Sequence, residues 1–236
     1  MLRMMFGEPP RKASGRLMDT IMAMERFVTL LQKRIEKSSG NEDVLKKYEI
    51  WTLGLLGSVD ELEQSQYVAD HFAAGLTTCY LNRMSEEELM NYYRYIYFDK
   101  NAFIRVFSLL DKLGTLMNEM FELKTEKVKP YFSYFTVLRN MRENNLQPEL
   151  SKSLNAIKDR YSIEMARLRK RRNTEIHYMN SEMQDDLQRI RSDYGGEVLL
   201  ENIKEQKLDL EACCILVMES LHLTFDYGCR KMKGKG

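Results

Sequence analysis

Apolar residues recur every three or four positions through most of this 236-residue chain, and that spacing is the period of an α-helix. The longest run of this kind extends from Leu154 to Ile190. No segment shows the alternation of apolar and polar residues, bounded by turn residues, that predicts a β-strand. The pattern therefore predicts an all-α fold, a helical bundle.

Glycine and short polar residues indicate where the helices of the first half begin and end. The second expected helix covers residues 43–56. We expect Gly57 and Ser58 to interrupt it, because both residues are weaker helix formers than their neighbours. Asp99 or Asn101 is expected to cap a new helix, because a side-chain oxygen can accept hydrogen bonds from the first backbone N–H groups. Gly114 within that helix indicates close approach of another helix.

In the second half, Pro148 suits the first turn of the longest helix, where its missing N–H is not needed. A final helix is expected over residues 197–227, because apolar residues continue there at helical spacing. The basic residues 230–236 that follow are expected to be disordered.

One charged residue interrupts the apolar face of the longest helix. Leu168 precedes it and Ile176 follows it, and the helical step between them falls on Arg172. Burying an unpaired guanidinium is strongly unfavourable, so a simple core position is not expected. Three alternatives remain: Arg172 extends its charged end to water, the helix breaks nearby, or the side chain faces a polar groove where a carboxylate or an anion binds it.

A histidine follows Arg172 at short spacing. His177 is one of only three histidines in the chain, and Asn173 lies one helical turn before it on the same face. The sequence contains no Gly-rich phosphate loop, no His-Glu-x-x-His zinc motif and no nucleophile elbow. Acid–base chemistry on a phosphodiester remains, since histidine can exchange a proton near neutral pH and arginine can bind phosphate oxygens with two donors.

The segment Arg172-Asn173-x-x-x-His177, followed by Tyr178, resembles the signature of the HEPN superfamily. Domains of that superfamily are all-helical and carry an arginine, four to six further residues and a histidine. The aromatic-rich stretch Tyr95–Leu123 is also similar to helices of HEPN domains. The resemblance implies a HEPN-like bundle with a core of four or more helices over residues 85–236. Residues 1–84 would form an N-terminal helical extension packed into the same domain.

The resemblance also implies an activity, because HEPN ribonucleases assemble their active sites at a homodimer interface. By this resemblance the chain would be a metal-independent endoribonuclease that uses no cofactor and leaves a 2′,3′-cyclic phosphate and a 5′-hydroxyl. His177 would move the proton, Arg172 would stabilise charge on the phosphate, and Asn173 would orient one of them. Such domains often act as toxins or defence effectors, and some have a nucleotidyltransferase antitoxin as a partner.

A cluster of basic residues surrounds the arginine of this motif. In the ribonuclease interpretation the cluster would hold RNA phosphates and release counterions. The alternative is a solvated basic helix face whose charges pair with Glu164 and Glu175. The predicted phosphate-binding residues are Arg167, Arg169, Lys170 and Arg171.

The spacing of the motif raises a geometric difficulty. On a straight helix, residues five apart point about 140° away from each other, so Arg172 and His177 of one chain would not converge. Two arrangements resolve this. The helix bends or restarts at Asn173 and Thr174, which are both good N-cap residues, or two chains pair so that both copies line one groove.

Composition limits the remaining choices. The net charge is +1, so any attraction for RNA must be local rather than a property of the whole chain. The four cysteines form no C-x-x-C pair and are expected to be reduced thiols, which fits a cytoplasmic protein. The sequence shows no signal peptide, and no apolar run approaches the ~18 residues that would cross a membrane.

A different class of function fits the same helices. The motif lies far from the C-terminus and a complete helix follows it, which is a departure from the family pattern. The chain is therefore also compatible with a non-catalytic HEPN-like dimer or another helical interaction protein. In an unrelated helical protein, the spacing of Arg172 and His177 would be coincidental.

Overall fold

Amphipathic patterning produces helices throughout the described part of the chain. The computed structural model describes residues 2–37, 42–177, 200 and 202–234. These residues contain no β-strand, which confirms the all-α prediction. The longer helices are α1 (Gly15–Ile35), α2 (Glu42–Ala73), α3 (Glu86–Met120), α4 (Tyr134–Glu143), α5 (Pro148–Arg160), α6 (Ser162–His177) and α8 (Ile203–Lys233), and the short 3-10 helices are η1 (Leu2–Phe6), η2 (Leu81–Arg83) and η3 (Thr125–Lys127).

Two expected interruptions are absent because tertiary packing outweighs local propensity. Helix α2 runs through Gly57 and Ser58, where the Ser58 hydroxyl donates to the backbone oxygen of Gly54 at 2.9 Å. A glycine inside a helix costs only about 1 kcal/mol, which burial of neighbouring apolar side chains offsets. Helix α3 likewise continues through Asp99, so the prediction of a new helix there is wrong.

In the second half of the chain, a helix is interrupted where the sequence predicted that it would continue. The single long helix predicted from Leu154 onward is divided, because α5 ends at Arg160 and α6 begins at Ser162. Pro148 does open α5, as its fixed backbone angle favours. Helix α8 extends to Lys233, so much of the basic tail is helical rather than disordered. The apolar run after residue 178 lies outside the described residues.

The described chain divides into two compact units, and α2, α3 and α8 contribute to both. Unit 1 comprises residues 1–10, 62–104 and 162–213. Unit 2 comprises residues 11–61, 105–161 and 214–236. None of the described helices combines the length and the apolar character needed to span a membrane.

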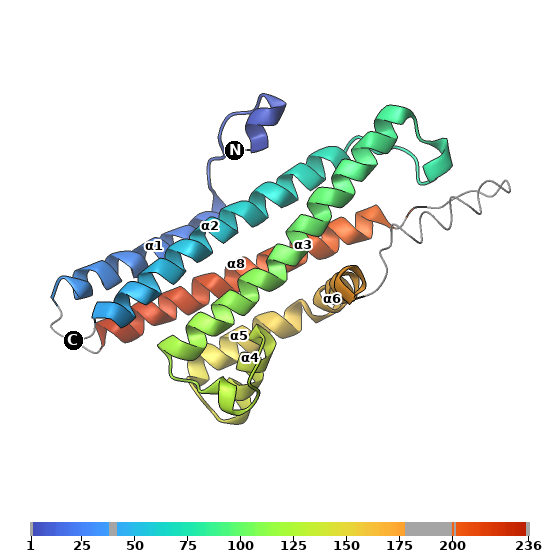
Figure 1. Ribbon diagram of the computed structural model, residues 1–236. Coiled ribbons are helices and arrows are strands. Elements are labelled where there is room, and N and C mark those ends of the chain that lie inside the picture. Colours follow the sequence, from blue (N-terminus) through green and yellow to red (C-terminus); the bar gives the residue numbers. More distant parts are fainter. Residues whose placement is uncertain (1, 38–41, 178–199, 201, 235–236) are drawn as a thin grey trace. The chain divides into compact units, whose positions relative to one another are not determined.

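Unit 2 is built around large buried side chains from several helices. Phe27 of α1 and Phe225 of α8 meet edge to face, with ring centroids 5.2 Å apart. Tyr134 at the start of α4 is 1% exposed and donates its hydroxyl hydrogen to Ser220 at 3.1 Å. Helices α4 and α5 lie side by side beyond the end of α3 (Figure 1). These contacts form the core of unit 2.

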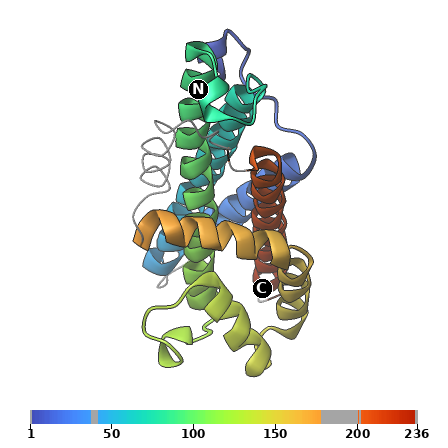
Figure 2. The same ribbon diagram turned by 90° about the vertical axis from the view of Figure 1, so that its right-hand side faces the viewer.

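Unit 1 has its own core around the first half of α3. Tyr92 and Tyr95 of α3 pack with Ala69 of α2 and Leu81 of η2, and all four are buried. Helix α6 adds Met165 and Leu168, which are 3% and 0% exposed. Figure 2 shows α6 running across α3 rather than along it. This crossing brings the predicted motif helix against the core of unit 1.

In unit 2, Gly114 of α3 lies close to the backbone at the start of α4. A Cβ atom at Gly114 would lie 2.9 Å from the Cα atom of Tyr134, so the expected close contact is confirmed. We predict that Gly114→Ala lowers the free energy of unfolding by about 1–2 kcal/mol, because overpacking costs more than the gain in helix propensity.

Denaturant unfolding of the full chain measures this effect. Gly57→Ala is the matched control, because it is also helical and a Cβ there would meet nothing within 4 Å. The control should raise the free energy of unfolding by about 0.5–1 kcal/mol. Equal stabilisation by both substitutions would show that the backbone contact at Gly114 is unimportant.

Candidate nucleic-acid site on helix α6

Helix α6 presents two chemically different faces. Met165, Leu168 and Arg172 follow one another at helical spacing on the face that packs into unit 1, and Arg172 is half-buried there. The adjoining face carries Arg167, Arg171 and Glu175, which are also spaced by one turn. The helix is therefore held to unit 1 by apolar contacts on one side and by charged contacts on the other.

Two arginines of α6 bind carboxylates that are almost fully buried. Arg167 makes a two-donor contact with Asp209 of α8, with Nε 2.7 Å from Oδ2 and Nη2 2.5 Å from Oδ1. Arg171 pairs with Asp99 of α3, and its guanidinium lies 5.0 Å from the centre of the Phe103 ring. Asp99 and Asp209 are each 2% exposed. A carboxylate at that depth requires such a partner, because burial removes its hydration.

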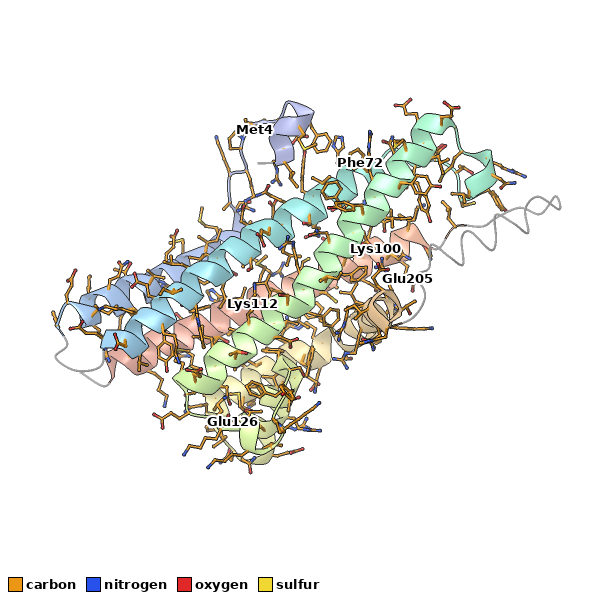
Figure 3. The ribbon with its side chains drawn as sticks, viewed as in Figure 1. Met4, Phe72, Lys100, Lys112, Glu126 and Glu205 are labelled. Carbon is orange, nitrogen blue, oxygen red and sulfur yellow. The ribbon has the colours of Figure 1, made fainter. Side chains whose placement is uncertain are left out.

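A third ion pair has the opposite polarity. Lys100 of α3 lies 3.0 Å from Glu175 of α6, one turn beyond Arg171. Successive residues of α3 thus carry a carboxylate and an ammonium, and they meet a guanidinium and a carboxylate four residues apart on α6. This alternation specifies one position of α6, because sliding the helix by one turn would separate each charged group from its oppositely charged partner. Figure 3 shows Lys100 of α3 and Glu205 of α8 beside α6.

These pairs surround a cavity of about 660 Å³ within unit 1. Its walls come from α3, α6 and the beginning of α8. Aromatic and aliphatic side chains, including Tyr92, Ile96 and Ile203, alternate in the walls with the ion-paired groups. Burial raises the pKa of Tyr95, which lines the same cavity and donates its hydroxyl hydrogen to Gln206 at 3.2 Å. The cavity is thus both polar and partly apolar.

The predicted catalytic residues occupy different surroundings on α6. Arg172 and Asn173 are half-buried, whereas His177 is exposed and is the last residue of the helix. Tyr178 lies outside the described residues. The helix continues without interruption through Asn173 and Thr174, so the alternative in which it restarts there is wrong. Residues five apart on an uninterrupted helix point about 140° away from each other, so Arg172 and His177 of one chain diverge.

The predicted phosphate-binding residues separate into two pairs. Arg167 and Arg171 are engaged with Asp209 and Asp99, as described above. Arg169 and Lys170 are exposed. The cations of α6 therefore divide into two that bind buried carboxylates, Arg167 and Arg171, and two that lie at the surface, Arg169 and Lys170. An RNA role for any of the four stays a prediction.

Sequence reasoning did not identify the acidic partners of α6. Asp99 was expected to be a helix cap, yet it lies inside α3 and binds Arg171. Asp209 stands between two leucines in an apolar stretch, and that position was the available signal of a buried charge needing a partner. Lys100 and Glu175 gave no such signal, because exposed charges on helices are common.

The buried thiol of Cys213 and the possible metal ligands do not suggest a second catalytic site among the described residues. Burial, and secondarily the nearby Asp209 carboxylate, raises the pKa of the Cys213 thiol to about 12, so this thiol is a poor nucleophile at neutral pH. In the part of the chain that the structure describes, no group of three or more His, Cys, Asp or Glu side chains is placed to hold a metal ion.

The ion pair of Arg171 should contribute to stability. Arg171→Ala would leave Asp99 buried without its guanidinium, and removing one partner of a buried pair typically costs about 3–5 kcal/mol. We predict a loss near the lower end of that range, because the Arg171 side chain is itself 21% exposed. Chemical denaturation measures the loss.

Lys170→Ala is the matched control on the neighbouring position, and it should change the free energy of unfolding by no more than about 0.5 kcal/mol. Its side chain is exposed, and among the described residues it makes no ion pair. If Arg171→Ala were as mild as this control, the buried pair would not hold α6 in place.

Comparison with known proteins agrees with the helical architecture. The Cthe2314-like HEPN family matches residues 51–229, which is most of the chain and includes all of α3, α4, α5 and α6. No curated protein matches the chain. No solved structure matches it either. An all-helical chain that carries Arg172-Asn173-x-x-x-His177 on α6 and matches this family over most of its length belongs to the Cthe2314-like HEPN family.

Proposed function

We propose that the protein is a metal-independent endoribonuclease of HEPN type that acts as a homodimer. The observation that carries the proposal is the placement of the motif in a chain of this family. His177 is exposed at the end of α6, and Arg172 lies on the same helix. An exposed imidazole can reach a nucleic acid on the surface without a change in the fold.

The proposed reaction is an internal transfer within the RNA strand. The 2′-oxygen forms a bond to phosphorus while the bond between phosphorus and the 5′-oxygen breaks. One imidazole accepts the proton of the 2′-hydroxyl, and a second imidazolium donates a proton to the departing 5′-oxygen. The products carry a 2′,3′-cyclic phosphate and a 5′-hydroxyl, so atoms and charges balance without an oxidant or a metal-bound water.

Two histidines are available if two chains form one groove. His177 of one protomer would act as the base and His177 of the partner subunit as the acid. Arg172 would stabilise negative charge on the phosphate, and Asn173 would orient Arg172 or His177. The uninterrupted α6 helix supports this arrangement over a single-chain site, because Arg172 and His177 diverge within one chain.

Nearby cations would bind the RNA strand outside the reacting phosphate. Arg169 and Lys170 are exposed and can contribute directly. Arg167, whose side chain is 44% exposed, can reach a phosphate while it keeps Asp209 neutralised. Arg171 would contribute mainly by holding α6 against α3.

The biological role would follow from the activity. An RNA-cleaving HEPN protein suits a toxin or defence effector, and a nucleotidyltransferase antitoxin is the proposed partner that silences it. The setting would be the cytoplasm, since the four cysteines are free thiols. In this proposal residues 1–84 form an N-terminal helical extension and residues 85–236 form the HEPN-like helical bundle, and the family match covers residues 51–229.

A second candidate function is a non-catalytic HEPN-like dimer that binds another molecule. The observation that favours it is the use of Arg167 and Arg171 in ion pairs within unit 1. In this alternative the basic residues hold α6 in place and Arg172 completes its packing. The cleavage assay separates the two candidates.

The first experiment incubates the purified protein with single-stranded RNA in the presence of EDTA. We expect cleavage to products with cyclic phosphate ends, and we expect His177→Ala to lower the rate by about 10²–10⁴-fold, the usual contribution of a general acid or base. His71→Ala is the matched control, because His71 lies on α2 and its ring stacks on Phe6 3.8 Å away. Intact RNA, or equal cleavage by His177→Ala, would refute the nuclease.

The second experiment tests whether two chains form the site. Rate per chain should rise with protein concentration across the range where light scattering or sedimentation shows monomers associating. The dimer is expected because each chain separates its own Arg172 and His177 on α6. Full activity from a species that stays monomeric at every concentration would contradict the two-chain site.

A further inference from the structure

The cavity in unit 1 is not used by the proposed phosphodiester chemistry. Its volume, about 660 Å³, lies within the range of roughly 300–1,000 Å³ typical of small-molecule sites. All of its lining residues belong to unit 1, so the cavity is defined by contacts within that unit. Neither Arg172 nor His177 is among the lining residues.

Two residues that line the cavity lie on the same side of α6 as His177. Lys170 and Thr174 line it, and His177 follows Thr174 by one turn on the same side of α6. The spacing of four and then three residues places these side chains along a line of about 10 Å, since each helical residue rises about 1.5 Å. A ligand in the cavity would therefore have its exposed end close to His177.

The polar groups of the walls offer both hydrogen-bond donors and acceptors. Glu205 is about half exposed and contacts Arg167 at 3.5 Å, so part of its carboxylate faces solvent. Asn202 uses its amide oxygen to accept from the Glu205 backbone N–H, and its NH₂ group makes no hydrogen bond within the described residues. Charges in the walls are mostly paired, so the part of a ligand that lies between these walls is expected to be polar and uncharged.

One cation at the cavity differs from the others. The Lys170 ammonium makes no ion pair with any residue that the structure describes, whereas Lys100, Arg167 and Arg171 each bind a carboxylate. Lys170 is also exposed, so it can bind an anion without giving up a partner. The arrangement is a polar, partly apolar cavity with a single available positive charge on the side that leads to His177.

We propose that this cavity binds one nucleotide of the RNA strand, with its base inside and its phosphate at Lys170. A base has an apolar ring and edges with donors and acceptors, and the walls supply Ile96, Ile203, Asn202 and Glu205 for these groups. This inference rests on the proposed ribonuclease function, and it adds a subsite that positions the strand so that a neighbouring phosphate reaches His177.

A binding experiment on the full chain tests the subsite apart from catalysis. The protein carries His177→Ala, and each of the four ribonucleoside 5′-monophosphates is titrated by calorimetry up to about 5 mM, so that dissociation constants near 1 mM are measured. Inorganic phosphate is titrated in parallel. At least one nucleotide should bind, and phosphate alone should bind at least about tenfold more weakly because it lacks the base.

Matched variants locate the bound nucleotide. Lys170→Glu should weaken nucleotide binding by about tenfold or more, and Lys204→Glu by less than about twofold. Both change the charge equally, and Lys204 is exposed on α8 without lining the cavity. Thr174→Trp should abolish binding by filling the cavity, with circular dichroism confirming that the helices remain.

The outcomes separate the subsite from the nuclease. RNA cleavage by the wild type without nucleotide binding would overturn the subsite and leave the nuclease standing. Nucleotide binding without RNA cleavage would overturn the nuclease and retain the nucleotide site. Equal weakening by Lys170→Glu and Lys204→Glu, or binding of phosphate as strong as that of nucleotides, would show general attraction of anions and would overturn the subsite.

Discussion

The buried carboxylates Asp99 and Asp209 are the constraint on which the position of α6 depends. Each is 2% exposed, and each pairs with an arginine of α6. Two charges taken out of water tolerate few alternative arrangements, because any other register of α6 would leave a carboxylate buried without its partner. The helix that carries the family motif is therefore held by a requirement for charge neutralisation as well as by the packing of Met165 and Leu168.

This constraint has consequences for chemistry at the surface. Arg171 is occupied inside unit 1 and Arg167 is bound to Asp209, whereas Arg169, Lys170 and His177 of α6 are exposed. A rigidly seated helix also keeps Arg172 and His177 on different sides. The catalysis that we propose for this motif would consequently require a second chain, because Arg172 and His177 diverge within one chain.

The same ion pairs line the cavity beside α6. The pairs Arg167–Asp209, Arg171–Asp99 and Lys100–Glu175 all contribute to its walls. The groups that fix the motif helix are thus also the polar groups of the cavity that we propose as a nucleotide site.

The sequence by itself determined the helical class, the Arg172-Asn173-x-x-x-His177 motif and the close approach at Gly114, because helical period, motif spacing and a glycine inside a helix are local properties of the chain. Only the tertiary structure decided that α2 and α3 run uninterrupted through Gly57 and Asp99, that α6 does not restart at Asn173, and that Arg171 faces Asp99. Those outcomes depend on packing and on charge pairing between residues far apart in the chain, and such contacts outweigh the weak local preferences that a sequence displays.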